Sequence, residues 1–392
     1  MPNDEEAMNA RDAAEDYRRQ RQAAEHGRDG FAEEVRAAFE QSKRNGLERM
    51  IGMARIYAGA SQARARADAV MADVSTQGLS PIDEPYGHRI ISGLAERVRR
   101  VCESGGIPVR EGVVIGVSPT AGLHAYQREV MATDVSIIDF AMPFVIFCNQ
   151  FSILLARTLP HVRVDGGSSV SCDPGAVAVA LEADTGLFRD WGLFASSYAI
   201  DGWPMELERL PVDGERVGTR VQMLFAMELF AVAHEYGHHV LMHGVTASSA
   251  IDADGLKMEY DADGFARMAS MAIGTNEEPP NPFATSGAGS VLMLGALDIV
   301  RRTRHVLATG ETEVPKRVTH PSLHERVGHV GSFDRFAPEG VRLQFQAMRS
   351  DLLGVVDAIW TALEPMLLAM HHEGGVRSGP AAEGAVDWMA LC

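Results

Sequence analysis

The stretch Leu224–His238, which reads LFAMELFAVAHEYGH, contains no residue that breaks a helix before Gly237. Its apolar run predicts a buried helix that ends in the pattern H-E-x-x-H. Two histidines four residues apart lie about one turn from each other on one helix face, so His234 and His238 can converge on a single ion. Neutral imidazole suits zinc. Glu235, beside His234, is placed to act as a base without binding the ion.

A third ligand is expected on a second helix. Small apolar residues recur between Leu256 and Ile273 at helical spacing and predict that helix. Glu259 and Asp263 are four residues apart on it. A glutamate at position 259 can bind the ion. Asp263, one turn further on, can accept the second ring N–H of a ligand histidine and fix its tautomer.

The neighbouring residues leave an alternative open. If the first helix ends at His243 with Gly244 as its cap, then His239 and His243 are rotated off the ligand face. An aspartate could replace Glu259 as the third ligand. The candidates for that replacement are Asp252, Asp254 and Asp261.

These motifs carry a family resemblance. H-E-x-x-H followed about twenty residues later by E-x-x-x-D resembles the gluzincin metallopeptidases. The segment Glu259–Ala266, EYDADGFA, is similar to the E-x-E-A-D-x-x-A segment of the CAAX prenyl protease and heat-shock membrane protease family. The segment His320–Arg326, HPSLHER, resembles the H-P-x-x-x-x-R element of that family. The resemblance covers about residues 218 to 330.

The resemblance implies a zinc-dependent endopeptidase whose substrate is a protein or peptide. Zinc lowers the pKa of a bound water to roughly 7, and Glu235 would take the proton of that water as it attacks. His320 and Arg326 would line the site and hold the substrate or the oxyanion, with Arg326 paired to a carboxylate near Asp263. The ligands implied by the family are His234, His238 and Glu259.

The chain departs from this family in its hydropathy, because the best-known members are embedded in membranes. A spanning helix needs ~20 apolar residues. The closest stretch noted in the sequence, Phe140–Ala156, is uncharged over 17 residues but carries four polar or helix-breaking residues. We expect a buried core helix there, or a strand leading into one, and no stable membrane insertion. A soluble protein that contains H-E-x-x-H also resembles the phage-exclusion type of bacterial peptidase.

Composition limits the partners and the compartment. The 53 acidic residues outnumber the 36 basic ones and give a net charge of −17, which argues against a nucleic-acid partner. The N-terminal residues lack an apolar signal segment. The cysteines form no C-x-x-C pair and are expected to be free thiols in a reducing compartment. We therefore expect a cytoplasmic protein, and its oligomeric state stays open. The cysteines are Cys102, Cys148, Cys172 and Cys392.

The expected fold is α+β and mostly helical. A zincin-like catalytic domain over residues 106–335 would hold the H-E-x-x-H helix, the second ligand helix and a small sheet. Residues 1–105 form a helical N-terminal region, with disorder left open for 1–30, and residues 336–392 form a C-terminal helical segment. Residues 274–290 are expected to be a long loop. Strands are expected near 113–117, 136–140 and 161–164, one of which supplies the edge that an extended substrate pairs with.

Two other functions remain open at this stage. The chain could be a catalytically silent zincin-fold protein that regulates or binds, with a structural metal. Glu235 argues against this reading, because a closed structural site needs no base. The chain could also be a protease of the defence or toxin type with a single intracellular target.

Overall fold

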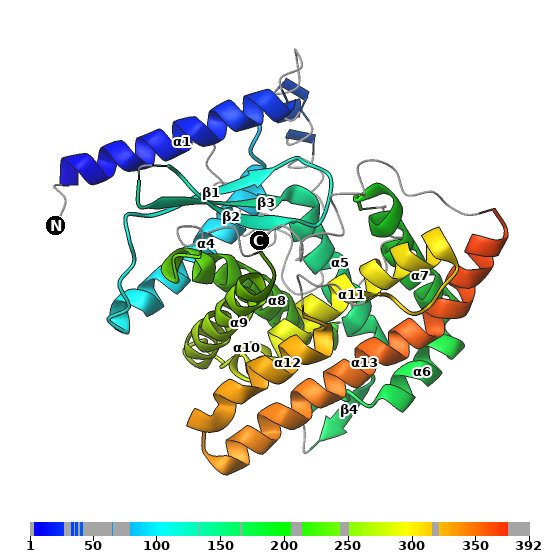
Figure 1. Cartoon of the computed structure of the whole chain (residues 1–392). Helices are drawn as coiled ribbons and strands as arrows, with labels where there is room; N and C mark the ends of the chain where they lie inside the picture. The colour runs from blue at the N-terminus through cyan, green and yellow to red at the C-terminus, as the bar shows by residue number, and fades with distance from the viewer. Residues whose placement is uncertain are drawn as a thin grey trace.

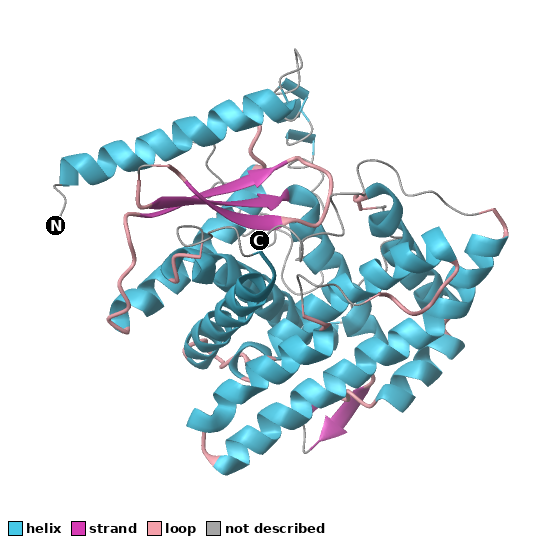
Figure 2. Cartoon of the chain, viewed as in Figure 1, coloured by secondary structure: helices cyan, strands magenta, loops and turns pink. Residues whose placement is uncertain are grey.

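The computed structural model describes residues 4–26, 79–131, 133–164, 167–204, 214–243, 251–315 and 321–374, with a few isolated positions between 33 and 65. These residues are mostly helical and include one small mixed sheet (Figures 1 and 2). The α+β, mostly helical class predicted from the sequence is confirmed. The helices are α1 (Asp4–His26), α4 (Pro85–Ser104), α5 (Met142–Thr158), α6 (Pro174–Ala183), α7 (Thr185–Asp201), α8 (Gly214–Val240), α9 (Ile251–Thr275), α10 (Pro282–Thr285), α11 (Ala288–Thr309), α12 (Leu323–Ser332) and α13 (Glu339–His372).

The sheet has three strands in the order β1-β3-β2. The sequence predicted β1 (Gly112–Ser118) and β3 (Val135–Ala141), which pair in parallel. It did not predict β2 (Ala125–Glu129), which pairs antiparallel with β3 and forms one edge. A separate two-stranded ribbon joins β4 (His161–Val164) to β5 (Gly167–Val170).

Helix α1 covers one face of the sheet, and α4 and α8 lie on the other side (Figure 1). Disorder was left open for residues 1–30, yet residues 4–26 form this helix. The helix is fastened by Arg18, which is buried. Its guanidinium donates to Asp83 at 2.9 Å and to Asp139 of β3 at 3.0 Å. A buried cation held by two carboxylates fixes the helix against the sheet.

One continuous apolar core runs from α4 to α13 and crosses both domain boundaries expected near residues 105 and 335. Helix α8 is central to it and packs against α4, α5, α9, α10 and α11. Its residues between Ala226 and Ala233 are buried, as the apolar run in the sequence predicted. The helix that carries the two histidines is therefore embedded in the core.

The prediction of a long loop over residues 274–290 is wrong. Helix α9 continues to Thr275, and α11 begins at Ala288 after the short helix α10. Proline starts α10, and Gly287 adopts a positive φ of 78° where α11 begins. The residues that suggested a loop are thus the caps of closely spaced helices.

Among the described residues, α13 is the one helix long and apolar enough to cross a membrane by length and composition. From the sequence we expected no apolar stretch of that length, and this prediction was wrong. In this structure α13 packs along α11 and α6, with Leu352, Ile359 and Leu367 buried. The segment that had been singled out, residues 140–156, forms the end of β3 and the buried helix α5, as predicted.

Candidate metal centre

The ligand-bearing helices α8 and α9 lie directly against each other. Gly237 permits the contact, because a Cβ at this position would meet Phe265 Cδ1 at 3.0 Å and Ala262 Cα at 3.3 Å. A larger residue would push α9, and with it Glu259, away from the histidines. The glycine inside H-E-x-x-H therefore sets the distance between the two helices.

Three side chains converge between these helices. Nε2 of His234 lies 3.1 Å from Nε2 of His238 and 3.4 Å from Oε2 of Glu259, and Nε2 of His238 lies 3.5 Å from Oε1 of Glu259. All three residues are buried. Ligand atoms bound tetrahedrally at ~2.0 Å are separated by about 3.3 Å. The three residues could therefore hold a metal ion.

Asp263 and Arg326 support this group from behind. Oδ1 of Asp263 lies 3.0 Å from Nδ1 of His234, which leaves Nε2 of that histidine for an ion. Arg326 of α12 donates to the same carboxylate at 2.6 and 2.7 Å, and its Nη2 lies 3.5 Å from Glu259. Ser322 begins α12 with a reciprocal capping box, which orients the helix that carries the arginine.

The charges of this buried group favour a cation. Burial raises the pKa of Asp263, but Arg326 and His234 more than offset that effect and lower it. Burial also raises the pKa of Glu259, which His234 and Arg326 bring well below its usual range. Burial lowers the pKa of His234, but Glu259 and Asp263 more than offset that effect and raise it to about 10, so the two carboxylates draw positive charge to this site. Oε1 of Glu259 has no hydrogen-bond partner among the described residues, as expected of an oxygen placed for a metal ion.

Glu235 is fully buried, and neither of its carboxylate oxygens has a hydrogen-bond partner among the described residues. Burial raises the pKa of its carboxyl to about 7, against the opposing influence of His234. A carboxyl with this pKa can take up or release a proton near neutral pH.

The edge of the sheet lies over this part of α8. Ser136 of β3 receives a hydrogen bond from the side chain of Gln127 at 2.7 Å, and its Oγ lies 2.8 Å from Nδ1 of His239. Arg110 donates to the backbone oxygen of His239 at 2.9 Å. These contacts fasten β2 and β3 to α8 one residue beyond His238. They also explain why His239 faces the sheet instead of the ligands.

The structure sorts the remaining candidates. Asp261, an alternative third ligand, is partly exposed and pairs with Lys257 at 2.7 Å. The side chains of Asp252 and Asp254 lie outside the described part of the chain, as does His320. Among the described side chains, the one His, Cys, Asp and Glu group able to hold an ion consists of His234, His238 and Glu259.

His243 lies outside the ligand group, as the sequence predicted, but its contact with His238 was not predicted. The helix ends at Val240, three residues earlier than assumed, and the chain then turns back. Nδ1 of His243 lies 2.8 Å from Nδ1 of His238. No spacing rule would have found this contact, because it depends on a non-helical turn.

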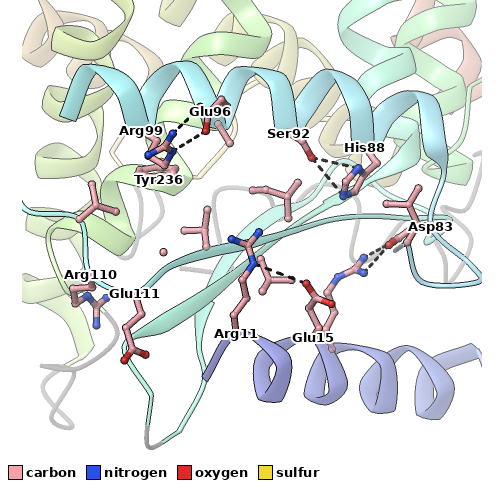
Figure 3. Close-up of a pocket in the computed structure, with 18 of the residues that line it drawn as sticks. Arg11, Glu15, Asp83, His88, Ser92, Glu96, Arg99, Arg110, Glu111 and Tyr236 are labelled. Atoms are coloured by element: carbon pink, nitrogen blue, oxygen red, sulfur yellow. Dashed lines mark hydrogen bonds and ion pairs between the residues drawn. The ribbon is translucent and has the colours of Figure 1, made fainter. Parts of the chain in front are cut away.

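A separate cavity of about 770 Å³ lies between α1, α4 and β1 (Figure 3). Tyr236, from within H-E-x-x-H, lines it beside the Arg99–Glu96 pair, and its buried hydroxyl has no partner among the described residues. None of His234, His238 and Glu259 lines this cavity. Tyr236 therefore projects away from the metal centre.

Comparisons with protein-family models, with curated proteins and with solved structures found no match to this chain.

Proposed function

We propose that this chain is a zinc-dependent endopeptidase of the gluzincin type, with a zincin-like catalytic domain. The observation that carries the proposal is the convergence of Nε2 of His234, Nε2 of His238 and the carboxylate of Glu259 at 3.1 to 3.5 Å, beside the unpaired carboxylate of Glu235. Two imidazoles and a carboxylate are the donor set of catalytic zinc sites in peptidases. A purely structural site would have no use for a buried base.

The ion would be held by His234, His238 and Glu259. When bound, zinc supplies a Lewis acid and lowers the pKa of water to roughly 7. Asp263 keeps the Nδ1 proton of His234 in place, and Arg326 holds Asp263. This orientation is set before substrate arrives, which is what a catalytic site requires.

Glu235 would serve as the general base. It would take a proton from the attacking water and deliver it to the leaving amine. Its buried position and its pKa of about 7 fit both steps. His320, which precedes α12 in the sequence, is proposed as a donor to the oxyanion on the family resemblance alone.

The substrate strand is proposed to pair with β2. This strand is an edge of the sheet, runs antiparallel to β3 and packs on α8, the helix that carries Glu235. An extended peptide added to such an edge would pass the ligands with its carbonyls in a defined register. A protein or peptide substrate and a cytoplasmic location are parts of this proposal.

The test compares wild-type protein with Glu235→Gln. Each is incubated with a cell lysate, and new N-termini are identified by mass spectrometry, so that one specific target suffices for detection. We expect Glu235→Gln to keep one zinc ion per chain by elemental analysis and to lose about 10²–10⁴ in cleavage rate. Glu228→Gln is a matched control on the same helix, and it should cleave like wild type. Equal cleavage by wild type and Glu235→Gln would refute the assignment.

A further inference from the structure

The chain reverses direction directly after α8. The backbone N–H of Leu241 donates to Gly237 at 2.9 Å, and that of His243 donates to the carbonyl of His238 at 3.1 Å. Met242 has a φ of 60°, the one described non-glycine residue with a positive φ. Placing a non-glycine residue in this left-handed region costs about 1–2 kcal/mol. Contacts with the rest of the fold must therefore stabilise the turn, because the backbone preference of Met242 does not.

The result of the turn is a contact between two imidazoles. Nδ1 of His243 lies 2.8 Å from Nδ1 of His238, with ring centroids 4.9 Å apart and the rings inclined at 70°. The other nitrogen of His238, Nε2, faces His234 and Glu259. His243 therefore meets His238 at the nitrogen remote from the ligand cluster and is not itself a ligand.

This contact completes a pattern. Each ligand histidine has one nitrogen in the cluster and one nitrogen held from outside, by Asp263 for His234 and by His243 for His238. A ligand imidazole whose outer N–H is held has a fixed tautomer and ring orientation. A neutral imidazole does this without adding a third carboxylate charge to a buried group that already holds Glu259 and Asp263.

We propose that His243 is a positioning residue for His238. It accepts the Nδ1–H of His238 at its own Nδ1 and so presents Nε2 of His238, unprotonated, to a metal ion. The left-handed turn at Met242 is the device that brings it there. The proposal rests on the metal-binding half of the proposed function and not on peptide hydrolysis.

The measurement is zinc affinity by competition with a chromophoric chelator, at one fixed pH. We expect His243→Ala to bind zinc about 10–100-fold more weakly, as for other lost partners of ligand histidines. His243→Asn should recover most of the affinity, because its amide oxygen can accept the same N–H. His324→Ala, which removes an exposed histidine, is the control and should bind like wild type.

The turn itself provides a second pair of variants. Met242→Gly suits a positive φ and should keep wild-type affinity. Met242→Val is β-branched, is costly at this φ and should displace His243, with a loss of affinity like that of His243→Ala. If His243→Ala fails to fold by circular dichroism, this pair and His243→Asn carry the test.

Cobalt(II) substitution gives a readout that is independent of activity. The visible absorption of the cobalt form should shift in His243→Ala and return toward the wild-type spectrum in His243→Asn. Unchanged zinc affinity and an unchanged cobalt spectrum in His243→Ala would overturn the proposal. Loss of a ligand from the cobalt spectrum of His243→Ala that His243→Asn does not reverse would also overturn it, since His243 would then bind the ion directly. Failure of wild-type protein to bind either metal would instead refute the proposed function.

Discussion

Arg326 and Asp263 form a two-point ion pair at 2.6 and 2.7 Å, with side chains that are almost wholly buried. The pair joins α12 to α9, two helices that are about sixty residues apart in sequence. Because the same carboxylate also holds His234 at 3.0 Å, the orientation of that histidine depends on an arginine of another helix. Stability and ligand geometry are thus coupled at Asp263.

Arg326→Ala should therefore be strongly destabilising. Removing one partner of a buried ion pair leaves the other charge uncompensated, at a cost of about 3–5 kcal/mol. The free energy of unfolding in urea gives this quantity. Arg326→Lys keeps the charge but not the two-point geometry, and it should fall between alanine and wild type. Arg99→Ala, which breaks a partly exposed pair with Glu96, should cost at most about 1 kcal/mol. Comparable losses in Arg326→Ala and Arg99→Ala would contradict this account.

Glu259→Ala should remove most of the bound metal with the fold retained. The carboxylate oxygens of Glu259 lie 3.4 Å from Nε2 of His234 and 3.5 Å from Nε2 of His238. Elemental analysis of purified protein measures the effect. Asp261→Ala is the matched control on the same helix, because that side chain points to Lys257. Full occupancy in Glu259→Ala would move the third ligand to Asp252 or Asp254.

Helices α8 and α9 could be predicted from the sequence because the spacing of residues within each segment indicates the helix and its buried face. The four-residue spacing puts His234 and His238 on one face of α8, and Glu259 and Asp263 on one face of α9. Small residues at positions 262 and 266 indicate the buried side of α9. Asp263 followed from the same spacing. Periodicity gave the two helices and their faces, whereas the choice of Glu259 as the third ligand came from the family resemblance.

Features that depend on tertiary contacts could not be predicted from the sequence. Strand β2 has the polar sequence AYQRE and owes its conformation to pairing with β3. The position of His243 depends on where α8 ends, because the turn after Val240 brings its ring to His238. The glycines near residue 287 suggested a loop, whereas Gly289 is there because a Cβ would overlap the carbonyl of Ala226 on α8.

Glu228 predicts a pH dependence of stability away from the metal centre. Burial raises the pKa of its carboxyl to about 8 in the folded protein, against the opposing charge of Arg220, whereas the ordinary value is 4.5. Between these two values the folded state holds a proton that the unfolded state has lost. The contribution of Glu228 is therefore fully present below about pH 4.5, falls by about 1.4 kcal/mol per pH unit as the pH rises, and is lost above about pH 8.

Urea unfolding of wild type and Glu228→Gln across this range isolates that contribution. The difference between the two proteins should shift in favour of Glu228→Gln as the pH rises from 5 to 8, because the amide carries no titrating proton. Above pH 8 the difference should become constant. A difference that stays constant throughout would mean that the carboxyl is ionised in the folded protein at all of these pH values.

The final prediction concerns the attachment of α1 to the sheet. Arg18 reaches Asp83 and Asp139 across Gly116, where a Cβ would overlap its guanidinium. Gly116→Ala should therefore displace Arg18 and release α1, and Arg18→Met should do the same by leaving two buried carboxylates without their cation. Trypsin should then cleave α1 after its arginines several times faster than in wild type, as followed by mass spectrometry.

Gly93→Ala is the control, since a Cβ there meets no atom within 4 Å. Zinc content should stay the same in all of these variants, because α1 covers the face of the sheet remote from α8. Cleavage of α1 at the wild-type rate in both Gly116→Ala and Arg18→Met would show that the helix is held by contacts other than this buried arginine.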